Sequence, residues 1–162
     1  LSLVGSEMCI RDSNSGSDTV TENLSEGTDT IRSSVTFTAS DNVENLFLTG
    51  SGDINGTGNS LDNKIYGNSG VNTLTGNGGN DILNGGAGGD SLDGGEGDDT
   101  LNGGVGDDYM SGGTGDDTYI VSNTGDTVTE NTSEGTDLIW SSVTFTASDN
   151  VENLYLFGSS PD

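Results

Sequence analysis

The sequence predicts an all-β fold, a right-handed parallel β-roll in which the chain winds into a narrow, two-sided β-solenoid. Glycine is abundant, with 28 of 162 residues, and only 28% of residues are hydrophobic, which is too little apolar mass for an ordinary layered core. A nine-residue unit repeats seven times without an insertion over residues 58–120. Each unit keeps one apolar residue at its eighth position, as a core shared by stacked strands would require.

The seven units read GNSLDNKIY, GNSGVNTLT, GNGGNDILN, GGAGGDSLD, GGEGDDTLN, GGVGDDYMS and GGTGDDTYI. Position one is always glycine, position two is asparagine or glycine, and position four is glycine in every unit but the first, which has Leu61. Because glycine and asparagine most easily accept a left-handed backbone, these positions predict a turn. Position eight carries Ile65, Leu74, Leu83, Leu92, Leu101, Met110 and Tyr119, all of which can face a core.

The repeat length predicts how the units stack. A three-residue strand over positions seven to nine, with position eight inward, fits the alternation of a β-strand, and a six-residue turn then reverses the chain. Two units complete a coil of 18 residues, so residues 18 apart should stack at the strand spacing of about 4.8 Å. Composition alone would favour a flexible, acidic, glycine-rich linker instead. A linker has no reason to keep an apolar residue at one position through seven copies, so we favour the solenoid.

Position six indicates what the repeat is for. It is asparagine in the first two units and then Asp81, Asp90, Asp99, Asp108 and Asp117. The coil places the first, third and fifth of these aspartates in a row on one edge and the other two in a row on the opposite edge. Neighbouring carboxylates within a row are about one strand spacing apart. Carboxylates this close together repel one another unless a cation neutralises them. The chain itself supplies few counter-charges, since it has 27 acidic and 3 basic residues and a net charge of -24. Calcium fits best, because it takes six to eight oxygen ligands and tolerates irregular cages better than magnesium does.

We expect three principal calcium sites with two carboxylates each: Asp81 with Asp99, Asp99 with Asp117, and Asp90 with Asp108. Carbonyl oxygens of the turn glycines complete the predicted ligand set, from Gly79, Gly86, Gly88, Gly95, Gly97, Gly104, Gly106, Gly113 and Gly115. Asn63 and Asn72 lack one charge, so their pairs with Asp81 and Asp90 should bind more weakly or not at all. Asp126 continues the position-six register and is a weaker candidate, because its turn has lost the glycines of positions one, two and four.

A longer duplication flanks the nonapeptides. The segment from Asp18 to Ser51 recurs from Asp126 to Ser159, and all but five of its positions are identical. The 108-residue period equals twelve nonapeptides, and Val20 and Val128 keep the position-eight phase, so we expect the flanks to continue the solenoid with longer strands. We therefore divide the chain into a first flanking repeat (14–57), the nonapeptides (58–120) and a truncated second flanking repeat (121–162), cut from a longer array.

The turns of the flanking repeats are longer and acidic. From Val20 to Ile31 and from Val128 to Ile139 the spacing is eleven residues instead of nine. The acids of these turns could be ligands, but we expect them to be solvated turn residues. They are Glu22, Glu26 and Asp29 in the first copy and Glu130, Glu134 and Asp137 in the second.

Residues 1–13 are interpreted as a non-native segment. The stretch LVGSEMCIRDS looks like the translation of a transposase adaptor used in sequencing libraries, since MCIRD back-translates to ATG-TGT-ATA-AGA-GAC. We exclude it as one would a cloning tag. Because Cys9 is the only cysteine and histidine is absent, thiol chemistry and Cys/His zinc sites are also excluded.

The composition excludes several other functions. Nucleic acids and anionic membranes need Lys and Arg, and no apolar run approaches the length of a membrane span, which is about 18 residues or more. No Sec-type signal peptide is visible. Paired acids such as Asp98 and Asp99 recur with the repeat, which indicates structure and not a unique active site, so we do not expect an enzyme. In that pair we expect Asp99 to be the ligand, with Asp98 adding mainly charge and one backbone carbonyl.

The pattern Gly-Gly-x-Gly-x-Asp-x-apolar-x, with aspartate at position six of five consecutive units, resembles the repeats-in-toxin (RTX) family, the calcium-binding parallel β-roll of secreted bacterial proteins. The resemblance implies calcium held between neighbouring turns, and export through the type I secretion machinery under an uncleaved C-terminal signal. It also implies a chain that folds only in the calcium-rich exterior, where metal binding supplies folding free energy. Two roles remain open for the longer chain: a spacer array of an adhesin or surface-layer protein, or the secretion and folding module of a protease or lipase.

Overall fold

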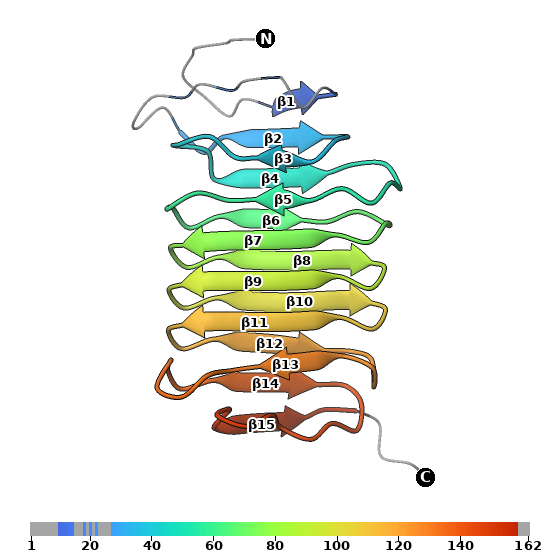
Figure 1. Cartoon of the computed structure of the whole chain (residues 1–162), viewed down its shortest axis with the longest axis vertical. Helices are drawn as coiled ribbons and strands as arrows, with labels where there is room; N and C mark the ends of the chain where they lie inside the picture. Colours follow the sequence, from blue (N-terminus) through green and yellow to red (C-terminus); the bar gives the residue numbers. More distant parts are fainter. Residues whose placement is uncertain (1–9, 15–17, 19, 21, 23–26, 159–162) are drawn as a thin grey trace.

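Two parallel β-sheets form one column in the computed structural model, which describes residues 10–14, 18, 20, 22 and 27–158. The nine-stranded sheet contains, in spatial order, β1 (Ile10–Ser13), β2 (Thr30–Ser33), β4 (Asn45–Leu48), β6 (Lys64–Tyr66), β8 (Ile82–Ala87), β10 (Thr100–Val105), β12 (Thr118–Val121), β14 (Leu138–Ser141) and β15 (Asn153–Leu156). The six-stranded sheet contains β13 (Thr127–Thr129), β11 (Tyr109–Thr114), β9 (Ser91–Glu96), β7 (Thr73–Gly78), β5 (Gly56–Thr57) and β3 (Phe37–Thr38). The strands stack from one end of the column to the other (Figure 1), and every pairing is parallel, so the predicted parallel β-roll is confirmed.

The strand register follows the predicted coil. Leu83 of β8 pairs with Leu101 of β10, and Leu92 of β9 pairs with Met110 of β11. Backbone N–H groups likewise bond to acceptors 18 residues away, as from Asp81 to Asp99. Equivalent positions of the nonapeptides therefore lie side by side in adjacent coils.

The strands are longer than predicted. Each of β7 to β11 has six residues instead of three, because pairing continues into positions one to three of the next unit, as where Gly104 pairs with Gly86 and Val105 with Ala87. The chain reversal then needs only positions four to six. The left-handed backbone expected at position two occurs at Asn77, with φ of 84°.

The first two units reverse differently. Asn59 and Asn68 occupy position two with φ outside the left-handed region. Their side-chain oxygens instead accept N–H bonds from Leu61 (2.9 Å) and Gly70 (2.8 Å), two residues onward. These are Asx turns, which reach the same reversal through a side-chain bond.

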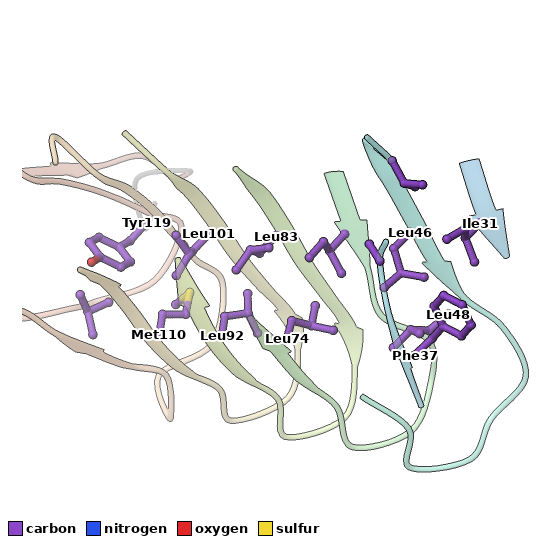
Figure 2. Close-up of a cluster of buried hydrophobic side chains, with 14 of the residues drawn as sticks. Ile31, Phe37, Leu46, Leu48, Leu74, Leu83, Leu92, Leu101, Met110 and Tyr119 are labelled. Carbon is purple, nitrogen blue, oxygen red and sulfur yellow. The ribbon is translucent and has the colours of Figure 1, made fainter. Parts of the chain in front are cut away.

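The core is a single line of side chains from each sheet, and Figure 2 shows the two lines facing one another. All seven position-eight residues are fully buried at 0% exposure. Burying one such side chain stabilises the fold by about 1.5–3 kcal/mol. Because each nonapeptide adds only one of them, the core alone gives each coil little stability.

The flanking repeats continue the solenoid, as expected, but with shorter strands instead of longer ones. Strands β2, β4, β14 and β15 have four residues each, and β3 has two. Ser33 ends β2 by bonding through its hydroxyl to the backbone of Val35 in both directions (2.7 and 3.2 Å). Val128 keeps the register and pairs with Met110. Strand β1 lies within the segment interpreted as non-native, and that origin remains an interpretation.

Candidate metal centre

The five position-six aspartates form two buried rows along the edges of the column. Each follows a turn and directly precedes one of the strands β8 to β12, and each side chain is only 1–2% exposed. One carboxylate oxygen, Oδ1, accepts the backbone N–H of the position-six residue in the preceding coil. The distances are 2.7 Å from Asp81 N to Asp99 and 2.7 Å from Asp99 N to Asp117. On the opposite edge, Asp90 N lies 2.8 Å from Asp108 Oδ1.

The second carboxylate oxygen of each aspartate lacks a partner. The Oδ2 atoms of Asp81, Asp90, Asp99, Asp108 and Asp117 are buried without a hydrogen bond. A buried polar atom without a partner costs about 1–3 kcal/mol, and more when it carries charge. Five such atoms in two rows are suited to bind a positively charged ligand.

Backbone oxygens converge on the same points. The Oδ2 atom of Asp99 lies 2.1 Å, and the carbonyl oxygen of Gly112 lies 2.6 Å, from the place where a β-carbon on Gly94 would sit. The same arrangement surrounds Gly76, with Asp81 Oδ2 at 2.1 Å and Gly94 O at 2.5 Å. Position one is therefore glycine because a carboxylate and a carbonyl share the space of its missing side chain. Oxygen donors of this kind suit calcium.

These position-one carbonyls were not in the predicted ligand set. The set contained the glycines of positions two and four, and all nine of them have φ angles between 96° and 138°. Their carbonyls face the next coil along the column; Gly79 O, for example, lies 2.3 Å from where a β-carbon on Gly97 would sit. Their role as ligands stays a prediction.

Burial disfavours the ionised form of these carboxylates. It raises the pKa of Asp81, Asp99 and Asp117 to about 7, although the N–H bonds to their Oδ1 atoms act in the opposite direction. Burial also raises the pKa of Asp90 and Asp108. A bound divalent cation would reverse this effect, because it favours the ionised form.

The three weaker candidates have their hydrogen bonds satisfied. Asn63 accepts the N–H of Asn59 (2.7 Å) and donates to Val43 O (2.9 Å). Asn72 likewise accepts from Asn68 N (2.9 Å) and donates to Ile54 O. Asp126 accepts three backbone N–H groups, from Asp108 (3.1 Å), Ser122 (3.1 Å) and Asn123 (3.0 Å). Their low rank as calcium ligands stays a prediction.

The expectation that the acids of the flanking turns are solvated is wrong for four of them. Glu22, Asp29, Glu130 and Asp137 are buried, at 1–6% exposure. Glu134 is half-buried, and Glu26 lies outside the described residues, as Cys9 does. Asp137 takes the next place in the row after Asp117, whose N–H bonds to its Oδ1 at 2.9 Å. The turn is two residues longer, so this bond spans 20 residues and hides the relation in the sequence.

Asp98 has a contact that its sequence position does not reveal. Its Oδ1 accepts the N–H of Asp116 at 2.9 Å, and its own N–H bonds to Asn80 Oδ1 at 3.1 Å. Along this edge, position five thus forms a second ladder between coils, in addition to contributing charge.

The fold and the two rows define a parallel β-roll whose turns are built to bind calcium. Residues 57–92 and 85–119 match the RTX calcium-binding nonapeptide repeat (4 copies). This part of the chain therefore belongs to the RTX calcium-binding repeat family, whose repeats bind Ca²⁺ as a structural and not a catalytic element. No curated protein and no solved structure matched the chain. Within the described residues, no helix is long and apolar enough to cross a membrane.

Proposed function

We propose that this chain is a calcium-dependent folding module of a secreted bacterial protein, which stays unfolded where calcium is scarce and becomes rigid outside the cell. The five buried Oδ2 atoms without partners carry the proposal. Their charge opposes folding until calcium binds, so the binding free energy becomes folding free energy.

The proposed ligands are the position-six carboxylates together with turn carbonyls. Asp81 with Asp99, Asp99 with Asp117, and Asp90 with Asp108 give three sites of two carboxylates each, because each pair already lies in adjacent coils. Hard oxygen donors and an irregular backbone cage favour calcium over magnesium.

Calcium titration of the complete chain tests the proposal. The chain is first freed of metal with a chelator, and calcium or magnesium is then added while circular dichroism and small-angle scattering are recorded. We expect a cooperative gain of β signal and compaction with calcium, and a much weaker response to magnesium. A β signal equally strong in chelator would overturn the proposal.

A matched pair of variants assigns the effect to the rows. Asp99→Asn removes one buried carboxylate, and Asp98→Asn removes one exposed carboxylate from the adjacent residue. Both variants lose the same charge, so a general effect of net charge would change them equally. We expect only Asp99→Asn to raise the calcium concentration needed for folding.

For the longer chain we propose a role as a spacer array on an adhesin or surface-layer protein, exported by the type I secretion machinery. The 108-residue duplication favours it, because β2 and β14 occupy the same sheet and equivalent places in the two copies. Six coils of about 4.8 Å would extend the column by about 29 Å per unit. The alternative, a secretion and folding module of a protease or lipase, predicts a catalytic motif upstream. The full reading frame separates the two, since many further copies of the duplicated unit support only the array.

A further inference from the structure

Three acidic side chains meet where the nonapeptides end. Oxygens of Asp117, Glu130 and Asp137 lie within 4.8 Å of one another, and all three residues are buried. Asp117 belongs to the last nonapeptide, Glu130 follows β13, and Asp137 precedes β14. Within the described part of the chain, no other group of three carboxylates converges in this way.

Glu130 occupies a place that is glycine in the other coils. Moving along the column from Gly58 by one coil at a time leads to Gly76, Gly94, Gly112 and then Glu130, so the glutamate is at position one of its coil. In the nonapeptides a side chain there would collide with the position-six carboxylate, as the 2.1 Å between Asp99 Oδ2 and a β-carbon on Gly94 shows. The longer turn moves Asp137 two residues along the chain, which makes room for the Glu130 side chain.

Tyr119 fixes the direction of the glutamate. It replaces the isoleucine, leucine or methionine that position eight has in the other units, and its hydroxyl accepts the N–H of Gly112 (2.5 Å) and donates to Glu130 Oε1. The other oxygen, Oε2, is buried without a partner, and so is Oδ2 of Asp117. Glu130 is 6% exposed and Asp117 is 1% exposed, so water does not compensate either atom.

We propose that Asp117, Glu130 and Asp137 form a calcium site of a different kind, with three carboxylates instead of two, which fastens the flanking repeat to the nonapeptide block. The inference rests on the proposed function, since it assumes that calcium loads the column. Affinity for calcium rises with the number of charged ligands, so this site binds at least about tenfold more tightly than the two-carboxylate sites and fills first. The ion also closes the long turn between Glu130 and Asp137.

Two variants and a control test the site in solution. Glu130→Gln and Asp137→Asn each remove one charge from the cluster. Glu134→Gln removes one charge from the same turn, where Glu134 Oε2 accepts bonds from Asn131 (3.0 Å from N and 2.9 Å from Nδ2). Calcium stoichiometry is measured by native mass spectrometry at limiting calcium, and affinity by competition with a chromophoric chelator.

We expect Glu130→Gln and Asp137→Asn to lose the tightest ion or to bind it at least about tenfold more weakly, while Glu134→Gln matches the unmodified chain. If the two cluster variants match the control, the proposed site is wrong. The proposed function survives that result, provided Asp99→Asn still impairs calcium-dependent folding. If calcium does not promote folding in any variant, both proposals fail.

Crystals of the unmodified chain grown with terbium, a trivalent substitute for calcium, give a test that does not depend on how the variants fold. We expect an anomalous peak between the carboxylates of Asp117, Glu130 and Asp137. Peaks along the two aspartate rows with none at Glu130 would refute the inference and leave the rows as the only metal sites.

Discussion

The role of Asp99 leads to the most specific prediction about the rows. It lies in two of the three principal sites, whereas Asp81 lies in one, because the neighbour of Asp81 on its other side is the hydrogen-bonded Asn63. If losing one carboxylate weakens a site about tenfold, each affected site costs about 1.4 kcal/mol when calcium is in excess. Asp81→Asn should therefore cost about 1.4 kcal/mol and Asp99→Asn about 2.8 kcal/mol.

Denaturant unfolding at fixed excess calcium measures these differences, with urea and circular dichroism as the probe. The same variants in chelator provide an internal control, because asparagine removes a charge that burial disfavours in the metal-free fold. There we expect no destabilisation, or a gain of stability. Equal losses for Asp81→Asn and Asp99→Asn in calcium, or equal losses with and without calcium, would refute the reasoning.

Three further predictions concern protonation, the position-five ladder and the position-one glycines. The folded-state pKa of Asp81, Asp99 and Asp117 is about 7, above their ordinary value of 3.8, so the metal-free fold is most stable below pH about 4 and loses that stability as the pH rises through about 7. Circular dichroism in chelator should show more β structure at pH 5 than at pH 8; less would contradict the burial of these carboxyls. Asp98→Ala should cost about 1 kcal/mol in urea unfolding by losing the bond from Asp116 N, while Asp98→Asn should cost almost nothing, since Asn80 makes the same bond. Gly94→Ala should cost about 1–3 kcal/mol and weaken calcium binding, because its β-carbon would lie 2.1 Å from Asp99 Oδ2. Gly78→Ala, with nothing nearer than 3.9 Å, should stay within about 0.5 kcal/mol, and similar losses for the two glycines would argue against a filled position one.

The coil was predictable because its signal is strictly periodic. An apolar residue at every ninth position and glycine at position one determine where the chain turns and which side chain faces inward, as Leu83 and Leu101 confirm. The strand length was not predictable from propensity, since glycine is a poor strand former. At Gly86 and Gly104 the parallel pairing comes from the neighbouring coil, and the local sequence does not reveal it.

The acids of the flanking turn show a second reason why sequence patterns fail. The insertion of two residues breaks the nine-residue count before Asp137, so its place in the row appears only when the coils are stacked. Glu130 could have been found, because Asp126 and Val128 still keep the register and position one follows two residues later. Composition misled the prediction, since polar and acidic residues between two strands are usually solvated.

The ladders at position five and at position six need different side-chain chemistry. Along one edge, the position-five side chains of Asp62, Asn80 and Asp98 each accept an N–H from the following coil, so asparagine serves there as well as aspartate. At position six each nonapeptide carboxylate accepts from the preceding coil and leaves its second oxygen without a hydrogen bond, as Asp99 does. Asparagine at that place uses its amide to bond to the backbone, as Asn63 does, and offers no free charge. On that edge the position-five bonds therefore need no cation, whereas under the proposed function the position-six rows depend on one.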